Sequence, residues 1–233
     1  MANLKEIRNR ITSIKSTMQI TSAMKMVSAA KLKKAQDAIT AMRPYSSKLT
    51  ELLQNLSATL ESDASGEYSK QRDVSKVLLV VITSNRGLCG GFNSSITKEV
   101  VKTINEKYSN TSVDLFTIGK KGNDVLSKGY NVTANRSDIY DDLTFSNVAS
   151  LAENLMELFV DGTYDKIEIV YNKFKNAATQ IVTQEQYLPI VAAEETDGAD
   201  ADYIFEPNKA EIVKGLIPKS LKMSVSMRMR PYR

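Results

Sequence analysis

The residue types that best suit phosphate chemistry in this chain are three glycines in one short stretch, Gly87, Gly90 and Gly91. They lie between an apolar run, residues 76–83, and a segment with helical spacing, where phosphate-binding loops are found. The stretch lacks the Gly-Lys-Ser/Thr ending of a P-loop, its glycines do not fit G-x-G-x-x-G, and no lysine follows to reach a phosphate. We therefore favour a structural turn that uses positive φ and close helix–strand packing, and we expect no cofactor.

The only cysteine, Cys89, lies in the same turn. A thiol near a helix N-terminus can be reactive, but without a second cysteine or a histidine we favour a buried structural thiol. The chain contains no histidine, which excludes His-based acid–base catalysis, Ser–His and Cys–His nucleophile pairs, and imidazole metal sites. We therefore predict no catalytic residue and no metal ligand, and a nucleotide-binding enzyme remains a minor alternative.

The elements that would position this turn form an α/β pattern. Residues 76–83, 113–119 and 166–172 are short apolar runs rich in β-branched residues, which is typical of strands buried on both faces. Helical spacing follows each of the first two strands and covers residues 145–159, and residues 179–188 alternate like an antiparallel edge strand. The pattern predicts a small Rossmann-like α/β central domain over residues 76–193. An acidic loop (194–202), an extended stretch (203–207) and a short helix (208–215) would follow.

Residues 1–60 predict one long shaft helix, followed by a polar linker over residues 61–75. No glycine precedes Gly66, and Pro44 is the only proline of the first sixty residues. The apolar residues step by three and four along one stripe, at Leu4, Ile7, Ile11, Ile14 and Met18. Such a helix would be about 85–90 Å long, and we therefore expect a coiled-coil-type helix that needs a partner.

The net charge is distributed unevenly between this helix and the rest of the chain. Residues 1–50 carry a net charge of +8, whereas residues 51–233 carry −4. This concentration favours an acidic neighbour, whether protein, phosphate or lipid. A basic helix that binds nucleic acid is a second alternative, and its binding would weaken steeply as salt rises.

Two stretches resemble the gamma subunit of the rotary ATP synthase. They are ITSAMKMVSAAKLKKAQ, residues 20–36, and TSNRGLCGGFN, residues 83–93. The resemblance implies a non-catalytic central-stalk rotor whose N-terminal helix rises through the catalytic head. It also implies that Met24 and Lys25 lie where the shaft passes the catalytic subunits. Five further basic side chains would face acidic loops of those subunits or water, namely Arg8, Arg10, Lys31, Lys33 and Lys34.

The same resemblance implies the partners and the location. The partners would be the alpha and beta subunits of the catalytic head, the epsilon subunit and the membrane ring of proteolipid subunits, with no nucleic acid. The sequence has no run of eighteen apolar residues, so we expect no transmembrane helix. Because no signal or transit peptide precedes the helix pattern, we expect a bacterial protein held peripherally on the cytoplasmic side of the inner membrane.

The likeness is expected to end at about Lys222. The family's shaft pairs two long antiparallel helices, whereas the last eleven residues here read MSVSMRMRPYR. Apolar side chains alternate strictly with polar ones from residue 221 to 230, and a period of two predicts a strand. This pattern raises the alternative of a truncated or frame-shifted gamma subunit that folds its central domain but cannot transmit torque.

Overall fold

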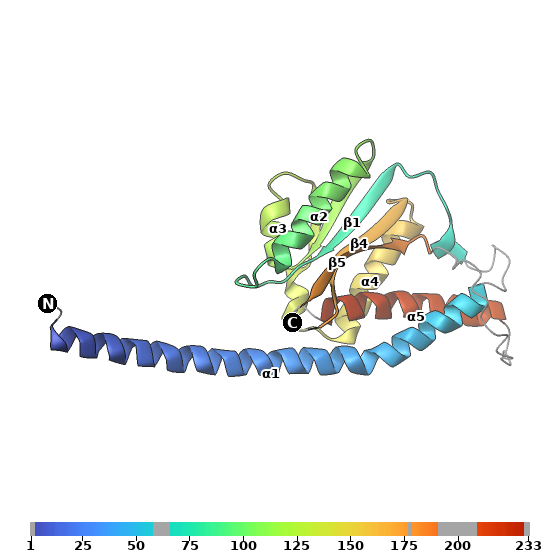
Figure 1. Ribbon diagram of the computed structural model, residues 1–233. Coiled ribbons are helices and arrows are strands. Elements are labelled where there is room, and N and C mark those ends of the chain that lie inside the picture. Colours follow the sequence, from blue (N-terminus) through green and yellow to red (C-terminus); the bar gives the residue numbers. More distant parts are fainter. Residues whose placement is uncertain (1–2, 58–65, 177–178, 191–208, 231–233) are drawn as a thin grey trace. The chain divides into compact units, whose positions relative to one another are not determined.

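The computed structural model describes residues 3–57, 66–176, 179–190 and 209–230. The chain divides into two compact units, Met1–Ala41 and Met42–Arg233. The first unit consists of most of one helix, and the second contains the sheet (Figure 1). The predicted acidic loop, residues 194–202, and the extended stretch after it lie outside the described residues.

The long N-terminal helix is confirmed. Helix α1 runs without interruption from Leu4 to Ser57 and contains Pro44. The predicted stripe along its first part is exposed, with Leu4 65%, Ile14 68% and Met18 63% accessible. These apolar side chains therefore have no packing partner among the described residues. An isolated helix is only marginally stable in water without such packing.

The sheet has five strands in the order β3-β2-β1-β4-β5. Strands β1 (Lys76–Ile82), β2 (Ser112–Ile118), β3 (Val132–Asn135) and β4 (Lys166–Phe174) are parallel, and β5 (Gln180–Leu188) pairs antiparallel to β4 at the edge. The three predicted buried strands and the antiparallel edge strand are confirmed. Strand β3 was missed because its four residues alternate between exposed and half-buried at the other edge.

Helices cover both faces of this sheet (Figure 1). Helices α2 (Phe92–Glu106) and α3 (Lys120–Leu126) lie on one face, and α4 (Phe145–Val160) and α5 (Lys209–Met229) lie on the other. Short 3-10 turns at Gly66–Ser69 and Ser137–Tyr140 complete the described elements. The chain winds outward from β1 to β3 and then returns to β4, so the direction reverses between β1 and β4.

Strand β1 is the centre of the core. All six side chains from Val77 to Ile82 are fully buried, because α2 covers one face and α4 the other. The buried face of α4 presents Leu151, Leu155 and Phe159 at helical spacing. Full burial on both faces explains why β1 is a continuous apolar run rather than an alternating one.

The predicted strand over residues 221–230 is wrong, because these residues belong to α5. Four of its side chains are buried at steps of four residues, namely Ile217, Leu221, Val225 and Met229. In an alternating sequence, residues four positions apart are also apolar. Residues four positions apart lie on one stripe of a helix, so the same apolar residues fit a helix as well. Packing of this stripe beside α4 selects the helix.

The helical stripe makes a prediction about two neighbouring apolar residues of α5. Leu221→Ala should lower the free energy of unfolding of the sheet unit by about 2–4 kcal/mol, because it leaves a cavity. Met223→Ala should cost about 1 kcal/mol, because Met223 is only half-buried. Urea denaturation followed by circular dichroism measures both values, with Lys219→Ala as the exposed control. Equal losses for Leu221→Ala and Met223→Ala would support the alternating strand pattern instead.

Candidate functional site

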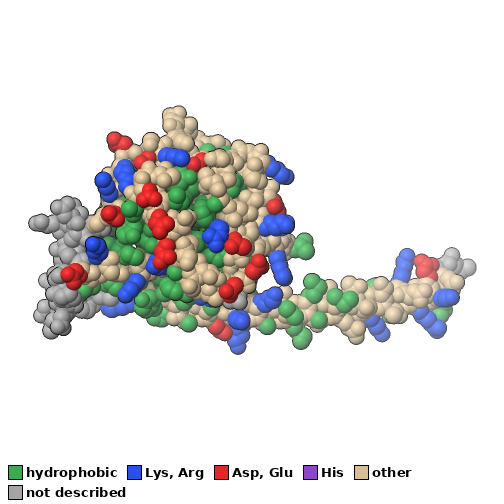
Figure 2. Space-filling model, turned by 180° about the vertical axis from the view of Figure 1, so that it is seen from behind, with side chains coloured by type: hydrophobic (Ala, Val, Ile, Leu, Met, Phe, Trp, Pro, Cys, Tyr) green, Lys and Arg blue, Asp and Glu red, His purple; other side chains and the backbone are tan. Residues whose placement is uncertain are grey.

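The seven predicted partner-contact residues are exposed side chains of α1. Met24 is 63% accessible, and Lys25 is exposed beside it. Figure 2 shows Lys and Arg side chains distributed along this helix, with few acidic ones among them. Arg10 pairs with Glu6 one turn away at 3.3 Å, and both side chains are largely exposed. Such an exposed pair contributes little to stability and leaves the basic surface available.

These side chains do not form a patch on one side of the helix. At 100° per residue, Met24, Lys31 and Arg10 point to one side of α1, whereas Arg8 and Lys33 point to the opposite side. Lys25 and Lys34 lie between these two directions. A helix with basic side chains all round its circumference suits neighbours on several sides better than a single docking surface.

The glycine-rich turn, residues 84–91, connects β1 to α2. Gly90 has a φ of +57°, a backbone conformation that favours glycine, as predicted for this turn. Gly87 and Gly91 have ordinary φ values, and an added Cβ would lie 3.6 Å from Lys121 Cε and 3.5 Å from Ser95 Oγ. Leu88 also has positive φ, +59°, and its side chain is fully exposed.

Asn93 organises this turn through hydrogen bonds. Its Oδ1 accepts from the Ser84 amide at 3.0 Å, and its Nδ2 donates to the Ser84 hydroxyl at 2.9 Å and to Cys89 Sγ at 3.2 Å. The prediction of a buried thiol is wrong, because Cys89 is exposed. The turn extends past the end of the sheet, so its side chains are held by hydrogen bonds rather than by burial.

The glycines that permit close packing lie instead at the connection between β2 and α3, and no sequence motif marks them. A Cβ on Gly119 would be 2.0 Å from the Thr83 carbonyl oxygen, and one on Gly122 would be 2.7 Å from Thr83 Oγ1. Thr83 Oγ1 accepts from the Gly122 amide at 2.9 Å, and Asn85 Oδ1 accepts from the Lys120 amide at 2.9 Å. The first amides of α3 therefore already have partners from the end of β1 and the residues after it, and an anion would have to displace them.

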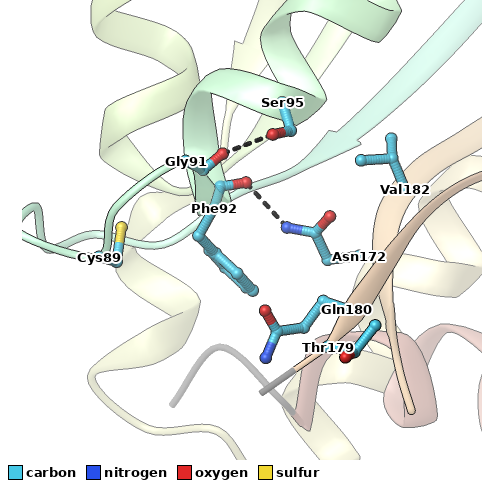
Figure 3. Close-up of a pocket in the computed structure, with 8 residues that line it drawn as sticks. All are labelled: Cys89, Gly91, Phe92, Ser95, Asn172, Thr179, Gln180 and Val182. Atoms are coloured by element: carbon cyan, nitrogen blue, oxygen red, sulfur yellow. Dashed lines mark hydrogen bonds between the residues drawn. The ribbon is translucent and has the colours of Figure 1, made fainter. Parts of the chain in front are cut away.

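A cavity of about 290 Å³ lies beside the reversal between β1 and β4, where ligands bind in open α/β sheets (Figure 3). The described residues that line it are Cys89, Gly91, Phe92, Ser95, Asn172, Thr179, Gln180 and Val182, and none of these is charged. Asn172 Nδ2 donates to the Phe92 carbonyl at 2.8 Å, and Ser95 Oγ donates to the Gly91 carbonyl at 2.7 Å. Because none of its described lining residues is a cation, the cavity is poorly suited to a nucleotide phosphate.

Among the residues that the structure describes, no three His, Cys, Asp or Glu side chains gather where they could share a metal ion. The buried carboxylate Glu168 has structural partners: Lys107 Nζ is 2.7 Å from Oε1, and Lys166 Nζ is 3.2 Å from it. Burial alone would raise the pKa of Glu168, but the hydrogen bonds and charge of its partners lower it below the usual range. Glu168 is thus held ionised at neutral pH at the amino end of β4.

The family model described as ATP synthase matches residues 3–229 of the chain. The gamma chain of Flavobacterium johnsoniae is 68% identical over 95% of this chain and 78% of its own length. This chain belongs to the ATP synthase gamma-chain family. The gamma chain of Christiangramia forsetii is 59% identical over 99% of this chain and 80% of its own length. As a gamma-type chain of this family, the protein is a non-catalytic subunit.

Solved structures agree in fold with this gamma-type chain. The central stalk and c-ring of the Tetrahymena thermophila mitochondrial ATP synthase gives a TM-score of 0.64 at 23% identity, over 91% of this chain and 92% of that one. The rotor of the Euglena gracilis mitochondrial ATP synthase gives 0.62 at 20% identity, over 97% and 83%. At these identities the likeness concerns the fold, which combines a long helix with an α/β domain.

The family match also extends beyond the predicted limit. It reaches residue 229 rather than ending at about Lys222, so all of α5 lies within the region that the family model describes. None of the described helices is long and apolar enough to span a bilayer.

The turn and the cavity predict that the sheet unit does not bind nucleotides tightly. Calorimetric titration of the chain with ATP, ADP or NAD should show no binding, because the described lining of the cavity contains no cation and the first amides of α3 already have partners. A micromolar dissociation constant for any of these nucleotides would overturn the structural interpretation of Gly87–Gly91.

Proposed function

We propose that this gamma-type chain is the central-stalk rotor of an ATP synthase, which couples proton flow through a membrane ring to ATP synthesis in a catalytic head. The observation that carries the proposal is the 68% identity to a gamma chain over 95% of the sequence. The first part of helix α1 supports it, because its basic side chains and its apolar stripe from Leu4 to Met18 are exposed and such a helix needs surrounding partners.

In this proposal the partners meet different parts of the chain. The alpha and beta subunits of the head surround α1, whereas the sheet unit contacts the epsilon subunit and the membrane ring of proteolipid subunits. The basic side chains around α1 would face acidic loops of the head as the helix turns. The complex would hold the chain peripherally on the cytoplasmic side of a bacterial inner membrane.

Coupling would arise because the helix is not symmetric about its axis. As α1 rotates, each catalytic site meets a different set of side chains, and contacts that differ between conformations change the site's affinity for nucleotide. Met24 suits such a surface, since an unbranched, polarisable side chain adapts to several neighbours. Proton flow would turn the rotor, and the changing contacts would release ATP from each site in turn.

One observation favours a second candidate, a gamma-type subunit that folds its sheet domain but cannot transmit torque. The last turn of α5 is held against the sheet unit, where Arg228 Nε donates to Glu185 Oε2 at 3.2 Å and Met229 is fully buried. In this second candidate, the last turn of α5 would stay bound to the sheet unit and would not serve as the second helix of a shaft.

Assembly and coupling distinguish the two candidates. The chain is expressed in Flavobacterium johnsoniae in place of the resident gamma chain, and membrane vesicles are assayed for proton-driven ATP synthesis and for ATP hydrolysis. We expect the chain to co-purify with the alpha and beta subunits and to support both activities. Co-purification with hydrolysis but without synthesis would favour the second candidate, and failure to co-purify would contradict both.

Met24→Lys in the same complex should lower ATP synthesis more than ATP hydrolysis. The substitution adds a charge where the helix would face acidic loops, and an additional ion pair would hold the rotor in one orientation. We expect a loss of about fivefold to tenfold in the ratio of synthesis to hydrolysis. Both rates are measured on the same vesicles.

The control for Met24→Lys is Asn105→Lys, which adds the same charge at an exposed position of α2. This variant should behave like the unsubstituted chain. Equal loss of both activities in Met24→Lys, together with failed assembly, would indicate packing damage instead of altered coupling.

A further inference from the structure

The segment that enters β1 is fastened to the turn that enters β4. Residues 66–76 lead into β1, and residues 159–165 lead from the end of α4 into β4. Side chains from both segments join them by hydrogen bonds, chiefly those of Arg72 and Asp165. We refer to this arrangement, consisting of Arg72, Ser75, the Lys76 amide, Asp165 and the carbonyls of residues 159, 160 and 164, as the clasp.

Arg72 makes the larger part of the clasp. Its Nη1 donates to the Phe159 carbonyl at 2.7 Å and to the Tyr164 carbonyl at 3.5 Å, and its Nη2 donates to the Val160 carbonyl at 3.4 Å. The guanidinium also lies over the Phe159 ring, 4.8 Å from its centroid. The last carbonyls of a helix lack partners within the helix and carry partial negative charge, so a cation is favoured there. A planar guanidinium presents several donors in one plane and can bond to more than one of these carbonyls at once.

Asp165 closes the clasp from the other side. Its Oδ2 accepts from the Ser75 amide at 3.0 Å, from the Ser75 hydroxyl at 2.7 Å and from the Lys76 amide at 2.9 Å. The Ser75 hydroxyl, the two amides and the charge of Arg72 lower the pKa of Asp165 against a smaller opposing effect of burial. The carboxylate therefore stays ionised at neutral pH and holds the first residues of β1 beside β4.

The position of the clasp in the chain points to a mechanical role, the transmission of force. Helix α1 ends at Ser57, and residues 66–76 are the described part of the connection from this helix to the central strand of the sheet. Any force that passes along the covalent chain between the helix and the sheet must cross this segment. Without fixed contacts, a short polar segment would bend or twist instead of transmitting rotation.

We propose that the clasp carries torque between the sheet domain and the long helix, with Arg72 as its positioning residue. This inference rests on the proposed rotor function and names the part of the chain through which that rotor is driven. Arg43 provides a further contact, since its Nη2 donates to the Phe174 carbonyl at 3.3 Å, but this bond is exposed and involves one carbonyl only. Leu49 of α1 is also buried. The clasp makes more hydrogen bonds than Arg43 does, and it joins α4, β4 and β1.

The test uses the assembled complex in membrane vesicles and three variants of the full chain. Arg72→Ala removes the bonds to all three carbonyls. Arg72→Lys keeps the positive charge but lacks the planar group with several donors. Lys70→Ala changes an exposed residue of the same segment and serves as the control. We expect Arg72→Ala to keep hydrolysis within about twofold while proton-driven synthesis falls about threefold to tenfold. Arg72→Lys should be intermediate, and Lys70→Ala should match the unsubstituted chain.

A purely structural role for Arg72 makes a different prediction. In that case synthesis and hydrolysis would fall together with the amount of assembled complex, in Arg72→Ala and in Arg72→Lys alike, and this result would overturn the proposal. An unchanged ratio of synthesis to hydrolysis in Arg72→Ala would overturn it as well.

Hydrogen exchange of the isolated full chain tests whether Arg72 anchors the segment, independently of the rotor function. In Arg72→Ala, amides of residues 70–76 should exchange at least about tenfold faster, while those of Val77–Ile82 in the core should not change. Unchanged exchange in residues 70–76 would show that Arg72 does not anchor the segment. If the unsubstituted chain fails to couple, the proposed rotor function is contradicted, and the exchange result alone then decides the anchoring role.

Discussion

The complete burial of strand β1 is the constraint on which the sheet unit depends. Six consecutive side chains from Val77 to Ile82 have no access to water, so both faces of the strand must be covered along its whole length. Parallel neighbours on either side require crossover helices, and these helices provide the two covering layers. The free energy gained by burying β1 thus determines where α2 and α4 lie and which of their side chains point inward.

With the centre of the sheet apolar, its polar groups are concentrated at the two ends of the strands. At the carboxyl end, Thr83, Asn85 and Asn93 satisfy the amides of the loops and of α3, where P-loop and Rossmann proteins bind phosphate. At the amino end, Arg72 and Asp165 fasten the incoming segment to α4 and β4. The same architecture that supports ligand binding in other proteins is used here to hold loops in place.

The long helix follows a different physical rule. It has no tertiary core of its own, and its apolar stripe and basic side chains are exposed in the first unit. A helix of this kind is stabilised by surrounding partners, since isolated helices are marginal in water. In the proposed rotor, a shaft with cationic side chains all round its axis would face several neighbours in turn.

The sequence alone determined the elements whose side-chain periodicity has one interpretation. The absence of glycine over the first sixty residues predicted α1, and three continuous apolar runs predicted β1, β2 and β4. Two motifs, around Met24 and Gly90, were long enough to indicate the family, which the matches then confirmed. These features are local, because helix propensity and a fully buried strand are both visible within a few residues.

Tertiary packing decided the rest. The alternation from Leu221 to Met229 fits both a strand and a helical stripe, and the face beside α4 selected the helix. Cys89 was expected inside, but its loop lies past the end of the sheet, which residue type cannot show. The close approach of Gly119 to Thr83 and the clasp between Arg72 and α4 join residues more than thirty positions apart. Contacts of this kind arise only when the strands are placed side by side, and no short sequence pattern encodes them.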